Sequence, residues 1–286
     1  MKRLDRSEII FKVLAYVLLT LFAIACLYPF VYLVSASISS VDAMDKGAVY
    51  LWPVGFQIKA YEKVFSDSLF WLAYCNTLFY TMYGTLVSML VGITGAYALS
   101  KSRLMFGRGF NFLLTFTMWF SAGLIPTYYN FKSLGVDNRY MYIIGLGFNA
   151  FNIILLRNYF SSVSTEIEEA ATIDGASEFQ LLTRIYIPMS KASIATVAMF
   201  YAISRWNGYL WAQMLLGAKD QPLQVYIRNT LTQVLEMSNS AGVTLDYSPY
   251  SMQYALLVCS ILPIIIIYPK IQKYFAAGVN VGGVKE

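Results

Sequence analysis

The chain of 286 residues contains no histidine and only three cysteines, and 13% of its residues are charged. The absence of histidine excludes histidine general bases, histidine metal ligands and serine–histidine–aspartate catalysis. Cys26, Cys75 and Cys259 all lie in apolar segments, so we interpret them as packing residues and expect no disulfide or metal site. A soluble domain carries about 25% charged residues. With 58% hydrophobic residues, this composition favours an integral membrane protein.

Apolar segments long enough to cross about 30 Å of hydrocarbon need about 20 helical residues each. Six such segments lie near residues 11–37, 73–100, 109–131, 140–160, 192–216 and 252–269. We therefore expect an all-α polytopic membrane protein with six transmembrane helices in one domain, residues 1–286. The first segment is longer than the apolar part of a signal peptide, so we interpret it as a span. Pro29, Pro126 and Pro263 are expected to kink their helices.

The distribution of lysine and arginine predicts the orientation of these spans. With the N-terminus inside, thirteen of the 21 basic residues fall in cytoplasmic segments, seven fall outside, and Arg205 lies within the fifth span. Both termini are therefore expected in the cytoplasm, together with the loop 161–190. The loop 217–251 is expected on the outer side.

The loop 161–190 interrupts the apolar pattern with acidic and small residues. Thr165 and Glu168 have the spacing of a capping box and predict a helix start. Gly175 should end this helix, and Ser177 should begin a second one. The second helix carries apolar residues at three- and four-residue spacing, namely Phe179, Leu182, Ile185 and Tyr186. Residue chemistry alone leaves two interpretations open, a solvated loop or a surface that docks a partner.

The stretch EEAATIDGASEFQLLTRIYIP within this loop resembles the EAA loop of bacterial ATP-binding-cassette (ABC) importer permeases. Further segments resemble the type I, maltose-transporter-like sugar branch of this family: YPFVYLVSASIS, WPVGFQIKAYEKVF and the tail KYFAAGVNVGGVKE, which ends in Val-Lys-Glu where Val-Lys-Gly is more usual. The segments PLQVYIRNTL and GLIPTYYNFKSLG look closer still to permeases for complex oligosaccharides such as oligouronides. The resemblance covers nearly the whole chain.

This resemblance implies a type I ABC importer permease fold whose loop 166–188 couples transport to a separate ATPase. In the family the loop forms a coupling helix that docks into a cleft of the ATPase. The residues that match the motif are Glu169, Ala170, Ala171, Asp174, Gly175 and Pro188. Glu169 is expected to meet a basic residue of the ATPase, and the two alanines are expected to pack in its cleft.

The chain has no G-x-x-x-x-G-K-[ST] phosphate-binding motif, so we expect it to bind no cofactor and to perform no catalysis. ATP and magnesium would belong to the partner ATPase. The resemblance implies a sister permease, two ATPase subunits and an extracellular or periplasmic sugar-binding protein as partners. A heterodimer of permeases is expected, with a homodimer as the alternative. We expect contact with membrane lipid, none with nucleic acid, and a multi-pass location in the bacterial inner or plasma membrane.

Polar and aromatic residues at membrane depth are candidates for the substrate pathway. They are Asn76, Asn149, Asn152, Arg205, Trp206, Asn207 and Tyr209. Intramembrane charge usually faces a bundle interior or a cavity, so Arg205 is a candidate partner for an acidic sugar. The alternatives are that Arg205 extends to the interface and that the asparagines bond to neighbouring helices.

Two other functions remain open on the sequence. The permease could import a solute other than sugar. An ion-gradient-driven transporter would carry buried acidic residues and repeated span triplets. The six predicted spans contain no Asp or Glu, which disfavours that second alternative.

Overall fold

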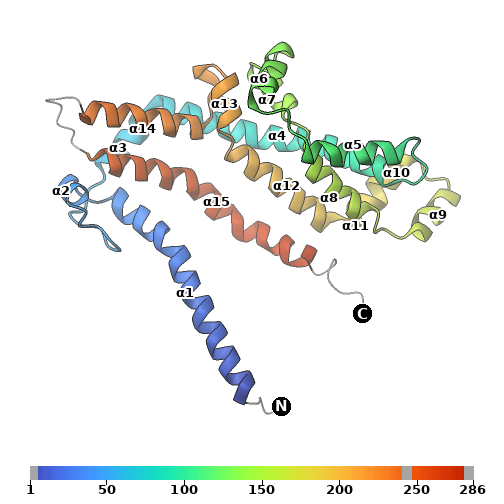
Figure 1. The fold of residues 1–286 in the computed structure, drawn as a ribbon, viewed down its shortest axis with the longest axis horizontal. Helices are drawn as coiled ribbons and strands as arrows, with labels where there is room; N and C mark the ends of the chain where they lie inside the picture. The colour runs from blue at the N-terminus through green and yellow to red at the C-terminus, as the bar shows by residue number, and fades with distance from the viewer. Residues whose placement is uncertain (1–5, 240–246, 280–286) are drawn as a thin grey trace. The chain divides into compact units, whose positions relative to one another are not determined.

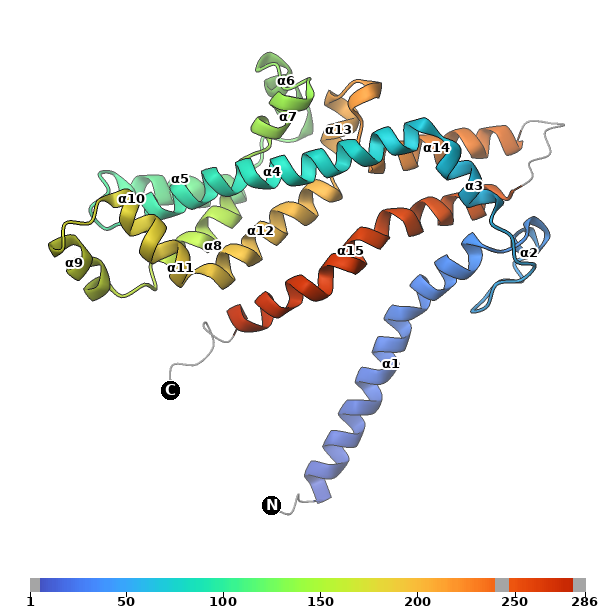
Figure 2. The same cartoon turned by 180° about the vertical axis from the view of Figure 1, so that it is seen from behind.

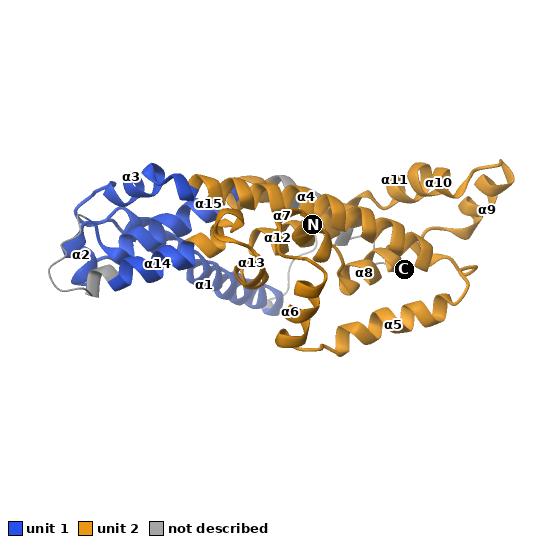
Figure 3. Cartoon of the chain, turned by 90° about the horizontal axis from the view of Figure 1, so that it is seen from above, with its two compact units in different colours: residues 1–70, 227–263 blue, residues 71–226, 264–286 orange. Residues whose placement is uncertain are grey.

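A computed structural model describes residues 6–239 and 247–279 as helices joined by turns, with no strand in those ranges (Figure 1). This confirms the all-α fold for the described residues. The chain divides into two compact units (Figure 3). Unit 1 comprises residues 1–70 and 227–263, and unit 2 comprises residues 71–226 and 264–286.

Unit 1 begins with the longest exposed apolar surface of the described chain, on α1 (Arg6–Ser37). This helix continues through Pro29 without interruption. After it come α2 (Val41–Asp45), α3 (Lys59–Ser66), the greater part of α14 (Leu223–Asn239) and the first part of α15 (Pro249–Val279). The end of α1 is fixed by hydroxyl groups, because the Ser37 and Tyr61 hydroxyls lie 2.8 Å apart and Ser39 donates to the Ser35 carbonyl at 2.7 Å.

Unit 2 is built around α4 (Ser68–Ser100), which belongs to this unit from Trp71 onward. The shorter helices that follow are α5 (Gly107–Trp119), α6 (Leu124–Ser133), α7 (Arg139–Gly145), α8 (Ala150–Phe160), α9 (Thr165–Ile173) and α10 (Glu178–Leu181). Next come the π turn η1 (Leu182–Tyr186), α11 (Ile187–Met189), α12 (Lys191–Trp206), α13 (Leu210–Leu215) and the 3₁₀ turn η2 (Ala218–Asp220).

Three helices in the described chain are long and apolar enough to cross a membrane: Ser7–Ser37, Ser68–Ser100 and Pro249–Pro269. Two further candidates are bent pairs. Arg139–Gly145 with Ala150–Phe160 bends by 52°, and Glu178–Met189 with Lys191–Trp206 bends by 86°. These five overlap the predicted first, second, fourth, fifth and sixth spans, although the fifth candidate begins at Glu178, within the loop 161–190, and ends at Trp206 instead of residue 216. The count of six spans and the orientation of the termini stay predictions.

The third predicted span, residues 109–131, is divided into α5 and α6 with a break at residues 120–123. The 13 residues of α5 extend only about 20 Å, less than the hydrocarbon thickness. Gly123 at the break has a φ of +86°, which favours glycine. Pro126 lies in the first turn of α6, where its missing N–H costs no helical hydrogen bond.

The main core of unit 2 joins α4, α8, α10, η1 and α12, of which α4, α8 and α12 lie side by side in Figures 1 and 2. Its fully buried side chains include Leu156, Phe160, Leu181 and Val197. A second cluster joins α4, α7, α13 and the start of α14 around Tyr80 and Tyr142. The two clusters hold α10 near one end of α4 and α13 near the other, and α9 lies close to α10 (Figure 2).

Candidate functional site

The helix α9, which carries the predicted coupling residues, begins one residue earlier than the sequence suggested. The Ser164 hydroxyl accepts a hydrogen bond from the Glu166 backbone N–H at 3.2 Å and so caps the helix. Thr165 is already helical, so the predicted capping box of Thr165 with Glu168 is wrong. Gly175 ends the α9 region with a φ of +83°, a left-handed conformation that strains any residue with a side chain.

The second helix, α10, begins where the sequence predicted, at Ser177. The Ser177 hydroxyl accepts from the Gln180 N–H at 3.3 Å, and the Gln180 side chain accepts from the Ser177 N–H at 2.8 Å. This is a complete capping box. Leu182 is buried in the chain's own core, but Phe179 is 74% exposed, so the two do not share the expected apolar face.

The residues that match the EAA motif form an exposed surface, with a shallow hollow beside it. Glu169, Ala170 and Pro188 are exposed, and Ala171 packs partly against the main core. Ala171, Asp174 and Gly175 line a hollow of about 350 Å³ together with residues of α10 and η1. The small side chains leave room for a partner to approach the backbone at this surface.

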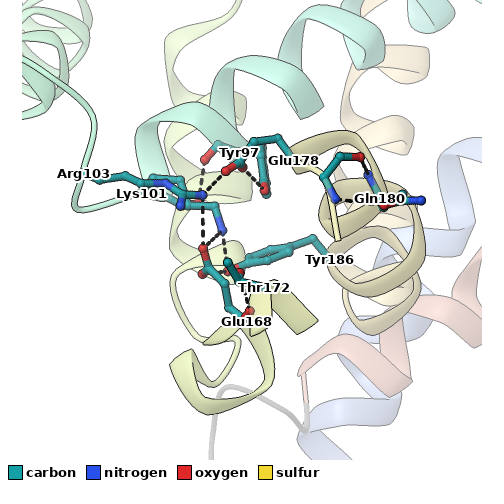
Figure 4. Close-up of polar contacts among 10 residues, drawn as sticks. Tyr97, Lys101, Arg103, Glu168, Thr172, Glu178, Gln180 and Tyr186 are labelled. Atoms are coloured by element: carbon teal, nitrogen blue, oxygen red, sulfur yellow. Dashed lines mark hydrogen bonds and ion pairs between the residues drawn. The ribbon is translucent and has the colours of Figure 1, made fainter. Parts of the chain in front are cut away.

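Lys101, the first residue after α4, joins α9 to η1 (Figure 4). Its ammonium lies 2.7 Å from Glu168 Oε1 and donates to the Tyr186 hydroxyl at 2.8 Å. The Tyr186 hydroxyl donates to Glu168 Oε2 at 2.6 Å. The ammonium also lies 4.4 Å and 3.9 Å from the ring centroids of Tyr97 and Tyr186, within cation–π range. A lysine side chain that is only 8% exposed is thus neutralised and hydrogen-bonded.

A second set of contacts ties α10 to the same end of α4. The Tyr97 hydroxyl donates to Glu178 Oε2 at 2.7 Å, and Arg103 forms an ion pair with the same carboxylate (Figure 4). Arg103 also lies 3.5 Å from Glu168 Oε1. Both α9 and α10 are therefore attached by polar contacts to the segment that contains residues 97–103. We refer to these contacts of Tyr97, Lys101, Arg103, Glu168, Glu178 and Tyr186 as the polar latch.

Glu168 is the centre of the polar latch, although the sequence pattern assigned it only to a helix cap. Burial raises its pKa, but hydrogen bonds from Lys101 and Tyr186 and the charges of Lys101 and Arg103 outweigh burial and hold the pKa below its usual value. Glu168 and Ala171 are three residues apart, so they share the inner, partly buried side of α9. Glu169, one residue after Glu168, is exposed.

Most of the predicted pathway residues meet at one cavity of about 730 Å³ in unit 2. Its lining includes Asn149, Asn152, Arg205, Asn207 and Tyr209. The bend between α7 and α8 supplies one wall, and the end of α12 with the residues 207–211 that follow it supplies the other. Further lining residues are largely aromatic: Tyr142, Phe148, Phe151, Phe200, Tyr201 and Trp211. The cavity therefore combines amide groups and one cation with several ring faces.

Arg205 is fixed at the wall of this cavity and does not extend to an interface. It is 8% exposed, and its Nη2 donates to the Ser88 hydroxyl and the Ile143 carbonyl, both at 3.3 Å, and to the Leu146 carbonyl. These carbonyls lie at the C-terminal end of α7, where a cation is favoured by the helix dipole. Gly84 of α4 leaves room for the guanidinium group.

Two predicted pathway residues lie elsewhere. The Asn76 side chain donates to the Lys219 carbonyl at 2.9 Å and the Gln221 carbonyl at 3.2 Å, and accepts from Arg139 at 3.3 Å. Asn76 therefore braces the segment before α14 and does not line the cavity. Trp206 is 6% exposed and packs edge-on against Tyr74 with 6.1 Å between ring centroids. Asn149 caps α8 by accepting from the Asn152 N–H at 3.0 Å, in addition to lining the cavity.

Comparisons with known proteins identify the family of this chain. Residues 1–281 match the family model described as binding-protein-dependent transport system inner membrane component. The chain is 34% identical over 281 residues to the polygalacturonan/rhamnogalacturonan transport system permease protein YtcP of Bacillus subtilis (strain 168), covering 96% of this chain and 98% of that protein. It is 35% identical over 265 residues to protein LplC of the same organism, covering 90% of this chain and 88% of that protein.

A solved structure is similar over the same range. It is the crystal structure of a bacterial ABC transporter involved in the import of the acidic polysaccharide alginate, in which one chain is 47% identical to this one with a TM-score of 0.88. The match covers 96% of this chain and 100% of that chain. The family match, the two relatives and the fold lead to one conclusion: this chain belongs to the inner membrane permease components of binding-protein-dependent ABC importers, and is a multi-pass protein of the bacterial membrane.

Proposed function

We propose that this permease carries acidic oligosaccharides into the cell as one subunit of an ATP-driven importer. Relatives named for alginate and polygalacturonan support a uronate-rich cargo, because both polymers carry a carboxylate on each sugar ring. The cargo moves through the membrane without covalent change, and the chain performs transport, not catalysis.

The cavity beside Arg205 is the observation that carries this proposal. Sugars are recognised by amide and hydroxyl groups that satisfy their hydroxyls and by aromatic faces that stack on the ring. Asn149, Asn152 and Asn207 supply amides, and Tyr209 and Trp211 supply rings at the same cavity. Arg205 adds a fixed positive charge in a region of low dielectric, where its attraction for a carboxylate is stronger than in water.

Coupling to ATP hydrolysis is assigned to the exposed face of α9. Glu169 and Ala170 project from this helix, and the hollow beside Ala171 and Gly175 can receive a partner side chain. ATP and magnesium bind a separate ATPase subunit, present in two copies, and the loop 161–190 faces the cytoplasm with both termini. A sister permease completes the pathway, and an external sugar-binding protein delivers the cargo.

The cargo is tested with the complete complex in proteoliposomes, comparing ATP hydrolysis with binding protein that is empty, loaded with an oligouronide, or loaded with a neutral oligosaccharide of equal length. We expect the oligouronide to stimulate hydrolysis and to enter the vesicles, and the neutral sugar to do so at least tenfold less. Equal transport of both would refute an acidic cargo. Transport of neither would refute a sugar importer.

The coupling surface is tested in the same vesicles with Glu169→Lys. A positive charge at this exposed site would repel a basic group of the ATPase, so we expect loss of ATPase copurification or of stimulated hydrolysis. Normal assembly with unchanged stimulation would show that Glu169 is a solvated residue with no role in docking.

A further inference from the structure

The helix α9 is held to the rest of unit 2 mainly by polar contacts. None of its residues is fully buried, and only Glu168 and Ala171 are partly covered. Beneath it lies a hollow of about 560 Å³, whose lining includes Lys101, Phe160, Thr172 and Tyr186. Because this helix stands over a hollow instead of packing flat, the ion pair of Glu168 with Lys101 is its principal lateral attachment.

Lys101 connects this attachment to one continuous helix. It follows directly on Ser100, the last residue of α4, so a force on Glu168 acts on the end of α4. The same helix carries Ser88, which accepts a hydrogen bond from Arg205, and Gly84, which lies against the Arg205 side chain. About 20 Å of helix separates Lys101 from Ser88. The exposed face of α9 and the cavity are therefore joined through a single rigid element.

We propose that Lys101 is the positioning residue through which α9 moves α4, and through α4 the Arg205 wall of the cavity. The proposal rests on the proposed coupling of α9 to an ATPase. Covalent connections alone would let α9 move with little effect on α4, because α9 is flanked by turns at residues 161–164 and by the glycine hinge at Gly175. Because the polar latch attaches α9 to the end of α4, a movement of α9 also moves α4.

The decisive experiment compares Lys101→Gln with Lys132→Gln, measuring sugar transported per ATP hydrolysed by the complete complex in vesicles. Lys132 is a matched control because it also pairs with a carboxylate, Asp137 at 3.9 Å, but at an exposed site away from α9. We expect Lys101→Gln to keep ATP hydrolysis within twofold of wild type and to lower transport per ATP about tenfold, a coupling loss within the range for directly interacting residues. Lys132→Gln should change neither. An unchanged ratio in Lys101→Gln would overturn the proposal.

Two further variants separate coupling from folding. Tyr186→Phe removes only the hydroxyl that bridges Lys101 and Glu168, so it should lower transport per ATP by a smaller factor even if Lys101→Gln fails to assemble. The exchange Lys101→Glu with Glu168→Lys should restore part of the ratio lost in Lys101→Gln. A general folding defect would lower hydrolysis and transport together, and that result in both Lys101→Gln and Tyr186→Phe would refute the proposal.

Hydrogen exchange tests the attachment of α9 independently of cargo and ATPase. In the purified permease, Lys101→Gln should accelerate amide exchange in residues 165–173 about tenfold, since loss of the latch frees the helix locally. Lys132→Gln should leave that segment unchanged. Equal exchange in wild type and Lys101→Gln would overturn the attachment itself. A failure of sugar transport in wild type, with this exchange result intact, would refute the proposed function and not the latch.

Discussion

Replacing Gly84 with alanine is a sharp test of how Arg205 is held. A Cβ atom at this position would lie 2.9 Å from Arg205 Nε and 3.1 Å from its Cδ, closer than ordinary van der Waals contact. The guanidinium cannot simply swing away, because Nη2 is bonded to Ser88 and to the carbonyls of Ile143 and Leu146. Gly84→Ala should therefore either strain α4 or break one or more of the hydrogen bonds of Arg205.

The size of the effect follows from two opposing contributions. Alanine is favoured over glycine in a helix interior by about 1 kcal/mol. Overpacking costs about 1–3 kcal/mol, and each lost hydrogen bond to a charged group costs about 1.5–3 kcal/mol. If Arg205 gives up one carbonyl partner to avoid the new methyl group, the overlap is relieved and the Gly84→Ala protein is less stable than wild type by about 0.5–2 kcal/mol.

Gly95 in the same helix provides the control, because a Cβ there meets no atom within 4 Å. We expect Gly95→Ala to keep or raise the apparent unfolding temperature of the purified permease, and Gly84→Ala to lower it by several degrees. Sugar transport should fall in Gly84→Ala because the Arg205 wall of the cavity moves. Equal unfolding temperatures and equal transport in the two variants would show that Arg205 is not fixed as described.

Two other predictions concern the coupling loop. Gly175→Ala should lower the stability of the loop by about 1–2 kcal/mol and weaken ATPase copurification, since its φ of +83° is unfavourable for alanine; Gly109→Ala, which meets no atom and has an ordinary φ, is the control. Glu168 has a lowered pKa, so the stability it contributes is present above its unfolded pKa of about 4.3 and is lost as pH falls through the folded value. The gap in unfolding temperature between wild type and Glu168→Gln should hold at neutral pH and shrink below about pH 4; a gap that does not change down to about pH 3 would contradict the ion pair.

The helices were predictable because apolar composition and length decide which segments enter a membrane. The break at residues 120–123 was not predicted. The expected kink was assigned to Pro126, whereas the helix is interrupted before Gly123, whose positive φ favours glycine. The bend between α7 and α8 was also missed. It is stabilised by Arg205, more than fifty residues later, and no local pattern reports such a contact.

Among candidate site residues, sequence patterns predict surface exposure better than they predict buried contacts. Glu169 and Ala170 were selected by a sequence motif, and the structure shows both exposed; their contact with a partner stays a prediction. Glu168 was passed over because its partner, Lys101, is distant in sequence and was assigned only to membrane topology. Asn76 was misplaced because its polarity is satisfied by backbone carbonyls of residues 219–221, which a sequence pattern cannot show.

The π turn at Leu182–Tyr186 makes the number of residues in this segment important for the contacts of α9. A π turn holds one residue more than an α turn, which rotates the residues after it by about 100° relative to a regular helix. Tyr186 is the last residue of this turn, and its hydroxyl reaches Glu168 while Ser177 still caps the start of α10. Deleting one residue here would leave a regular helix and turn the Tyr186 hydroxyl away. Relatives that are one residue shorter in this turn should therefore hold α9 by other contacts.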